Sequence, residues 1–335
     1  MRASVIIATI NGANVIKDAL ISLTEQSLPI DEYEIIVVDE SNNDAVAEIV
    51  KEVNPRIIYC RREMLGQHLA KNLGVRLAKA DIVLFTDDDV VVDKCWIEEI
   101  LKGYSNPLVG AVGGRIIGLW EEPAAKWMKY FSSFGDIRND YIITTLDLGI
   151  RFGFYGIHTL PKKLYRLYGA NISMRKDIIL EIGGTPPDAF PAKYNYLSGN
   201  GETDTLQSIE DLGYSLIYNH NAIVKHKIPK QRNIVPYVKQ RIIDNAYRSI
   251  YTSFKRKYNG NRKRLLFDIF PNTGTFIYRC IKYILATKDE RIYRGIKIYE
   301  PLAKMCQIFR VIRDKQLREL WLKKNYMETD TNDIK

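Results

Sequence analysis

The first third of the chain alternates short apolar runs with amphipathic stretches, and this alternation restricts the fold to a parallel sheet covered by helices. The apolar runs predict strands at residues 4–9, 34–39, 56–60 and 81–86, with a further strand at 109–117. The periodic stretches between them predict helices at residues 14–25, 44–53 and 67–78. The sequence therefore predicts an α/β domain with a mainly parallel sheet.

Polar residues follow these predicted strands. Parallel strands bring their carboxyl ends to one edge of the sheet, which is where ligands bind in such folds. The polar residues at this edge are Thr9, Asn11, Asp39, Arg61, Arg62, Asp87, Asp88 and Asp89. We therefore expect a binding cleft along this edge.

Asp87, Asp88 and Asp89 follow their apolar run without a break. Three adjacent carboxylates repel one another, and a cation bound among them relieves that repulsion. Oxygen ligands favour Mg²⁺ or Mn²⁺, with nucleotide phosphates completing the coordination. The alternative is a solvated acidic turn that leads into a helix starting near Asp93.

Glu202 and Asp204 lie at the start of a predicted helix that is stopped by Gly213. Gly201 beside them allows close backbone approach, and a carboxylate at a helix start faces a cleft rather than the core. Such a carboxylate is suited to take a proton from a sugar hydroxyl. The alternative role is helix capping, by Thr203 or Asp204.

The chain divides into an acidic part and a basic part. Residues 1–224 contain 22 Lys and Arg against 30 Asp and Glu, whereas residues 225–335 contain 27 against 10. The basic part is a predicted helical tail with amphipathic stretches at 234–254, 276–285 and 299–321. Such a tail suits an acidic membrane surface or a nucleic acid. A packed helical subdomain or a dimer contact is the alternative.

Neither a signal peptide nor a membrane span is predicted. The N-terminus turns polar after a short apolar run, and Arg279 and Lys282 interrupt the most apolar window of the tail. The four cysteines lie far apart without a Cys-x-x-Cys pair, so neither a zinc site nor a disulfide framework is suggested. We expect a cytoplasmic protein, with the cytoplasmic face of the cell membrane as a further location for the tail.

The residues alone leave the roles of two features undecided. Aromatic residues crowd the segment 120–165, where they form either a lid on the acceptor side of the cleft or a small aromatic core. His226 ends a short predicted strand at 222–226. A lone histidine is more often a packed or surface residue than a ligand.

Together these motifs resemble the family 2 glycosyltransferases over residues 4–226. The similarity begins with two strand regions, at residues 4–11 and 34–41, and with Gly66 followed by the helical residues 70–74. It continues with the acidic triplet at 87–89, the segments 169–175 and 202–204, and His226. Single motifs of this kind are weak signals, but their shared order is a strong one. The resemblance implies a GT-A fold in residues 1–228, followed by a basic helical region in residues 229–335.

The resemblance also implies a role for each residue. The donor nucleotide would be bound by Thr9, Asn11, Asp39, Lys71, Asp87 and Asp88, with Asp39 at the base and Asp87 at the ribose. Asp89 and His226 would hold the metal. Asn171 and Gly201 would line the pocket for the donor sugar and the acceptor. Glu202 would be the catalytic base and Asp204 its alternative, because the segment that follows departs from the family pattern.

The implied reaction is an inverting transfer of a sugar from a nucleotide diphosphate, with UDP as the expected nucleotide and Mn²⁺ or Mg²⁺ as the metal. The acceptor would be a saccharide or a lipid-linked species, and an oligomer remains open. One rival is a haloacid-dehalogenase-type phosphatase with Asp87 as nucleophile. The other is a nonenzymatic nucleic-acid or membrane binder working through the tail, with the basic clusters at residues 255–257 and 262–264 on phosphates. That rival leaves the acidic triplet unexplained, so we expect no nucleic acid as a partner.

Overall fold

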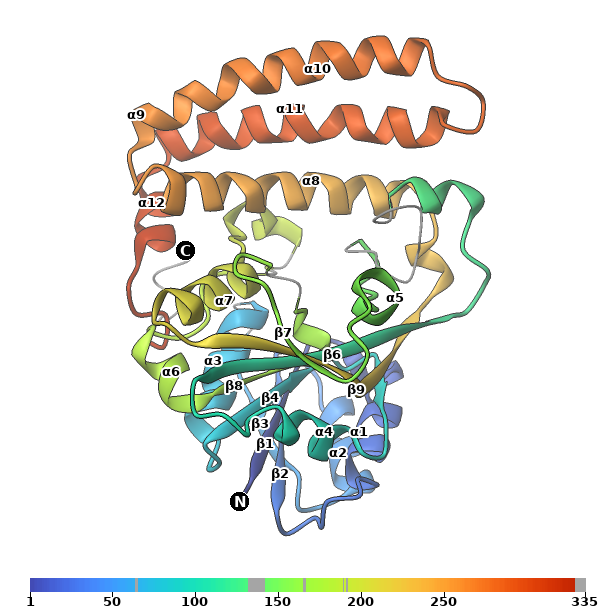
Figure 1. The fold of residues 1–335 in the computed structure, drawn as a ribbon, viewed down its shortest axis with the longest axis vertical. Coiled ribbons are helices and arrows are strands. Elements are labelled where there is room, and N and C mark those ends of the chain that lie inside the picture. Colours follow the sequence, from blue (N-terminus) through green and yellow to red (C-terminus); the bar gives the residue numbers. More distant parts are fainter. Residues whose placement is uncertain (64–65, 132–141, 165–166, 189, 191, 329–335) are drawn as a thin grey trace.

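The computed structural model describes residues 1–63, 66–131, 142–164, 167–188, 190 and 192–328. Its core is one mixed sheet, in which the strands are ordered β3-β2-β1-β4-β8-β6-β9-β5, and β7 pairs with β9 (Figure 1). The strands are β1 (Ala3–Thr9), β2 (Tyr33–Asp39), β3 (Ile58–Arg61), β4 (Ile82–Thr86), β5 (Val90–Val92), β6 (Val109–Trp120), β7 (Ile157–Thr159), β8 (Ile172–Arg175) and β9 (Ser215–Ile228).

The first four strands run parallel, as the sequence predicts, with β1 between β2 and β4. Every residue of β1, β2 and β4 is buried, which explains why these strands appear in the sequence as continuous apolar runs. The next strand in the order, β8, is antiparallel to both β4 and β6. The sheet is therefore mixed in its second half.

Short helices cover both faces of this sheet (Figure 1). They are α1 (Ile16–Thr24), α2 (Ala45–Val53), α3 (Gln67–Leu77), α4 (Trp96–Lys102), α5 (Leu148–Phe152), α6 (Lys176–Glu181) and α7 (Gly201–Asp211). The three helices predicted in the first third are confirmed to within two residues at each end. The acidic triplet leads first into β5, and α4 begins only at Trp96.

The basic tail forms a helical layer that lies across one end of the sheet domain (Figure 1). Its helices are α8 (Val235–Thr252), α9 (Arg262–Leu265), α10 (Ile269–Ile284), α11 (Arg291–Arg313) and α12 (Lys315–Leu322). The predicted apolar stripe at 234–254 is buried at Val238, Ile242, Ala246 and Ile250 of α8, and at Phe254 in the turn that follows this helix. The stretch predicted at 299–321 is two helices, because the Asp314 side chain accepts a hydrogen bond from the Leu317 amide and caps α12.

Part of the aromatic segment forms a small core, whereas Phe152 and Tyr155 are exposed. Trp127 and Phe131 belong to a cluster that contains Val238 and Ile242 of α8, and Phe131 also packs edge-on against Tyr293 of α11. This placement fits the aromatic-core interpretation better than a lid. Phe134, Tyr141 and Tyr165 of the same segment lie outside the described residues.

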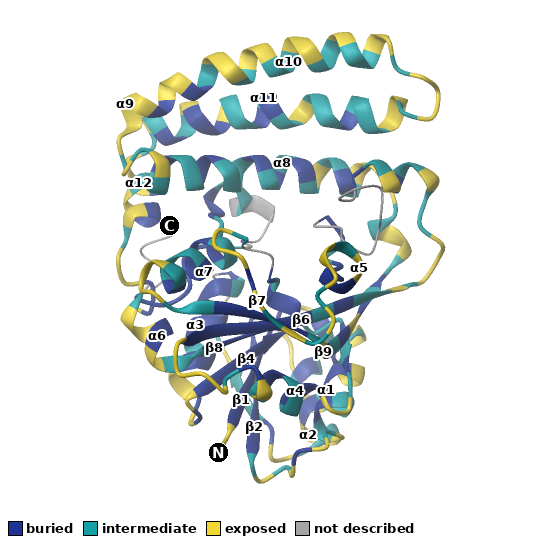
Figure 2. Cartoon of the chain, in the orientation of Figure 1, coloured by how far each residue is buried: buried dark blue, intermediate teal, exposed yellow. Residues whose placement is uncertain are grey.

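The outermost helix, α10, is amphipathic, but many of its apolar side chains remain exposed. None of its residues is buried, and Figure 2 shows it as mostly exposed or half-buried. No helix in the described ranges is long and apolar enough to cross a membrane.

Candidate active site

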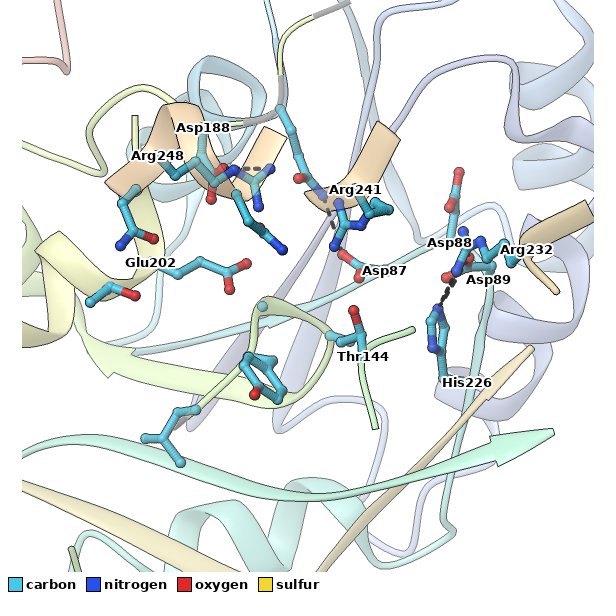
Figure 3. A pocket seen from close by; sticks show the side chains of 18 of the residues that line it. Asp87, Asp88, Asp89, Thr144, Asp188, Glu202, His226, Arg232, Arg241 and Arg248 are labelled. Atoms are coloured by element: carbon cyan, nitrogen blue, oxygen red, sulfur yellow. Dashed lines mark hydrogen bonds and ion pairs between the residues drawn. The ribbon is translucent and has the colours of Figure 1, made fainter. Parts of the chain in front are cut away.

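A cavity of about 520 Å³ lies where the sheet meets the helical layer. Its floor is the turn after β4 and the end of β9, and its sides are the start of α7 and one face of α8. Asp87, Asp88, Asp89, Glu202 and His226 all line it (Figure 3). The fold thus brings together residues that lie far apart in the chain.

Asp89 meets His226 because β5 pairs with β9. Val90 is the register partner of His226 in this antiparallel pair, and the Lys227 amide donates to the Asp89 carbonyl. Asp89 Oδ2 lies 3.4 Å from His226 Nε2, and His226 is 2% exposed. The two side chains predicted as metal ligands therefore face the same point.

Arg232, from a short turn before α8, completes this group. Its Nη2 donates to Asp89 Oδ2 at 2.7 Å, and its Nη1 lies 2.8 Å from His226 Nε2. Burial opposes ionisation of Asp89, but His226 and Arg232 outweigh it and lower the pKa of the carboxyl. A guanidinium at this point shows that the site attracts a cation.

The donor set fits a divalent metal that also binds substrate phosphates. Asp89 offers a carboxylate oxygen and His226 an imidazole nitrogen, and Mg²⁺ and Mn²⁺ are commonly held by few protein ligands plus phosphate oxygens. Among the described residues no group of three or more His, Cys, Asp or Glu is placed to hold a metal by itself.

Asp87 and Asp88 point to different partners. Asp87 accepts a hydrogen bond from Gln67 of α3 at 3.2 Å, and Asp88 accepts one from the Thr9 hydroxyl at 2.5 Å. Burial, with the charges of Asp89 and Asp87, raises the pKa of Asp88 to about 7. Asp88 thus connects the end of β4 to the end of β1.

A neighbouring cavity of about 300 Å³ extends from Asp88 and Gln67 toward Thr9 and Gly66. Asp39 is fully buried behind it, where its carboxylate accepts hydrogen bonds from the Ser41 amide and the Tyr59 hydroxyl, both at 2.8 Å. Asn11 is exposed, with a left-handed backbone (φ 54°). The two cavities share Asp88 and Gln67, which places the strand ends beside the acidic triplet.

Glu202 lies in the cavity wall opposite the metal ligands. Its carboxylate packs closely on Gly169, so that a Cβ at that position would come too close to Oε1 and would push the Glu202 side chain aside. Lys71 Nζ lies 3.7 Å from Oε1, so this lysine neighbours the proposed base. Burial raises the pKa of Glu202, Lys71 counteracts it, and the charges of Asp188 and Asp87 add to the rise.

Asp204 faces away from this cavity. It is 5% exposed, and it accepts hydrogen bonds from Tyr251 at 2.7 Å, Lys255 at 2.8 Å and Arg256 at 2.5 Å. Although burial opposes ionisation, these cations and the tyrosine lower the pKa of Asp204. The carboxylate thus ties α7 to the end of α8.

The structure corrects the expected position of Asn171. This side chain is fully buried, accepts from Trp96 Nε1 at 2.9 Å, and donates to the carbonyls of Arg115 and Ala222. Its amide is used within the sheet, and its neighbours Gly169 and Ala170 line the cavity instead. Gly201 lines a smaller recess beside Lys71 and Glu202.

Sequence reasoning missed the contribution of α8 to the cavity. Tyr237, Arg241, Asn245, Arg248 and Ser249 line it from that helix. Their spacing of roughly four residues is the helical period, so the sequence also contains a polar stripe beside the apolar one, about 100° around the helix. Asp188, which forms an ion pair with Arg248 at 3.2 Å, carried no such signal.

Comparison with known proteins identifies the class. The sequence model of glycosyl transferase family 2 matches residues 4–183, which are more than half of the chain. A glucosyl-dolichyl phosphate glucuronosyltransferase of Haloferax volcanii is 27% identical over 243 residues, which cover 72% of this chain and 69% of the relative. Glycosyltransferase AglE of the same organism is 25% identical over 227 residues, which cover 67% of this chain and 66% of the relative.

A solved structure supports the fold. Mannosyltransferase PcManGT from Pyrobaculum calidifontis, in complex with GDP-Man and Mn²⁺, matches at a TM-score of 0.50 and 17% identity, covering 92% of this chain and 73% of that chain. This likeness confirms the predicted GT-A fold. With the acidic triplet, His226 and Glu202 around one cavity, the chain belongs to glycosyl transferase family 2 and is a glycosyltransferase.

Proposed function

We propose that this glycosyltransferase transfers a sugar from a UDP-sugar to a hydroxyl group of a saccharide or lipid-linked acceptor, with inversion at the anomeric carbon. The observation that carries the proposal is the placement of Glu202 and the Asp89–His226 pair on opposite sides of one cavity. This arrangement separates a proton acceptor from a site for the leaving group, as a single in-line displacement requires.

In the proposed reaction, Glu202 accepts the proton of the acceptor hydroxyl as its oxygen bonds to the anomeric carbon. The bond from that carbon to the diphosphate breaks, and the diphosphate takes the electron pair. Asp89 and His226 would hold Mn²⁺ or Mg²⁺, which supplies Lewis-acid stabilisation of the leaving diphosphate when bound. Lys71 lies 3.7 Å from Glu202 and favours its ionised form.

We propose that the nucleotide binds in the neighbouring cavity, which lies beside the end of β1 and the start of α3. Thr9 and Asp88 face it directly, and Asp87 lies at its junction with the larger cavity. UDP is the proposed nucleotide. Asp39, at the end of β2, is compatible with uracil, but it also suits other bases, and its buried carboxylate already accepts hydrogen bonds from Ser41 and Tyr59.

We further propose that the acceptor is presented at an acidic membrane surface, to which α10 binds. Phe270 is 77% exposed and Ile284 is 74% exposed on this helix, which contains Lys282 and no acidic residue. Its Arg279 forms an ion pair with Glu300 of α11. Exposed apolar side chains beside cations match an interfacial helix on anionic lipid. Lipid-phosphate chemistry appears in the name of the Haloferax volcanii relative, which agrees with a lipid-linked acceptor.

The rival functions receive less support. Membership in family 2 argues against a phosphatase that uses Asp87 as a nucleophile. One of the two tail clusters proposed for nucleic acid is engaged within the protein, since Lys255 and Arg256 pair with Asp204, and Lys257 pairs with Asp268. The other cluster, at residues 262–264, is exposed, so salt-sensitive retention on RNA or DNA is the measurement that tests this rival.

Calorimetric titration with UDP, GDP and dTDP, each with and without Mn²⁺, tests the proposed donor. We expect UDP to bind, and to bind more tightly with Mn²⁺ in the wild type than in Asp89→Asn. A preference for GDP or dTDP would replace UDP in the proposal. No binding of any nucleotide by the folded protein would refute it.

A further inference from the structure

The cavity has two chemically different walls. The sheet side supplies carboxylates, whereas α8 supplies hydrogen-bond donors from the residues that we call the α8 stripe: Tyr237, Arg241, Asn245, Arg248 and Ser249. Positions four residues apart lie on one face of a helix, so these side chains face the cavity together. Figure 3 shows Arg241 and Arg248 directed into it.

Some hydrogen-bond donors of the α8 stripe have no acceptor among the described residues. Arg241 donates through Nε to the Ile142 carbonyl at 3.2 Å, and no carboxylate in the described part of the chain forms an ion pair with it. Burial and the charge of Arg248 lower the pKa of Arg241. Asn245 Nδ2 and Arg248 Nε are buried without a hydrogen-bond partner among the described residues.

Buried donors without partners are costly, and their cost is removed by a ligand that supplies acceptors. Guanidinium groups donate hydrogen bonds and accept none, and their planar geometry matches carboxylate and phosphate oxygens. The α8 stripe is therefore suited to a group that carries negative charge.

The position of the stripe separates this group from the donor diphosphate. The proposed diphosphate site lies at Asp89 and His226, where Arg232 already supplies a cation. Arg248 lies at the other side of the cavity, paired with Asp188 near Glu202 (Figure 3). A group held there lies on the side where the reacting sugars meet.

We propose that the α8 stripe binds a carboxylate or phosphate carried by one of the two reacting saccharides, either the transferred sugar or the acceptor. This inference rests on the proposed function and adds to it that one of the two reacting saccharides is negatively charged. Arg241 and Arg248 are then specificity-determining residues, contributed by the helical tail.

Two arms of one titration series distinguish the source of the charge. In the donor arm, UDP-glucuronate is compared with UDP-glucose in the presence of Mn²⁺. In the acceptor arm, glucose 1-phosphate is compared with methyl glucoside on protein saturated with UDP and Mn²⁺. We expect the anionic probe to bind about tenfold to a hundredfold more tightly in one arm, as for hydrogen bonds to charged groups.

Arg241→Gln should abolish that preference. The matched control is Lys239→Gln, which removes the same charge from the same helix at a side chain that lies over the Tyr299 ring instead. It should retain the preference.

UDP binding without any anionic preference in the wild type would overturn this inference and leave the proposed function standing. A preference that persists in folded Arg241→Gln would also overturn it. Failure of the wild type to bind any of UDP, GDP and dTDP would overturn the proposed function, and this inference with it.

Discussion

Arg232 Nη2 donates to Asp89 Oδ2 at 2.7 Å, so the central carboxylate of the proposed metal site is already paired with a cation. The same guanidinium contacts His226. A metal ion that binds Asp89 Oδ2 and His226 Nε2 would therefore compete with Arg232 for both atoms.

Replacing Arg232 should strengthen metal binding in the absence of nucleotide. Arg232→Gln removes an ion pair worth about 1 kcal/mol, which corresponds to roughly fivefold tighter binding of Mn²⁺. Titration of the nucleotide-free protein with Mn²⁺ measures the effect, and Asp89→Asn serves as the negative control. Equal or weaker affinity in Arg232→Gln would contradict the competition.

The two candidate bases should separate into different phenotypes. Glu202→Gln should lower kcat by about a hundredfold to ten-thousandfold with little change in Tm, because it removes the proton acceptor. Asp204→Asn should destabilise the fold by about 3 kcal/mol, because Lys255 and Arg256 lose their buried partner. Thermal unfolding and turnover of both variants test this, and a stable, inactive Asp204→Asn protein would make Asp204 the better base.

Activity should fall on the acid side at a higher pH than an ordinary glutamate would give. Glu202 works only when ionised, and burial raises its pKa above 4.5, so activity is lost as pH falls through that raised value. Lys71 opposes the rise, so Lys71→Met should move the acid limb of kcat to still higher pH. Lys71→Arg, which keeps the charge, should move it less. An acid limb that does not respond to Lys71→Met would count against Glu202 as the base.

Binding to anionic vesicles should depend on the exposed face of α10. Phe270→Glu and Ile284→Glu should each reduce flotation with phosphatidylglycerol vesicles, and high salt should weaken binding of the wild type. Leu108→Glu is the matched control, because Leu108 is 60% exposed and lies outside the tail. Concentration-dependent dimers that the α10 variants disrupt, without vesicle binding, would show that a second copy of the chain covers this face.

The fold was predictable because its strands are buried on both sides. Runs such as Val5-Ile6-Ile7 and Ile35-Ile36-Val37 leave little alternative to a covered parallel sheet, and both strands were predicted nearly to the residue. The second half was harder, because β8 enters antiparallel between β4 and β6. Local pattern does not encode which edge of a sheet a later strand joins.

The site was predictable where its residues lie in a motif and hidden where they depend on register. The resemblance named Asp89 and His226, but their contact requires β5, a three-residue strand paired with β9. Asp204 is two residues from Glu202, yet half a helical turn directs it to Lys255 instead of the cavity. The arginines of α8 were visible as charges, but their direction depends on how α8 packs over the sheet domain.

One face of α8 packs in hydrophobic clusters that join the tail to the rest of the chain, and another face lines the cavity. If this cavity is the active site, the sequence boundary after β9 is not a functional boundary. A fragment that ends at residue 228 would lack one wall of its own active site. Exchanging the tail between relatives would exchange part of the substrate pocket together with α10. Acceptor choice and attachment to a surface would therefore be inherited as one unit, and chimeras joined at this point should take both from the donor of the tail.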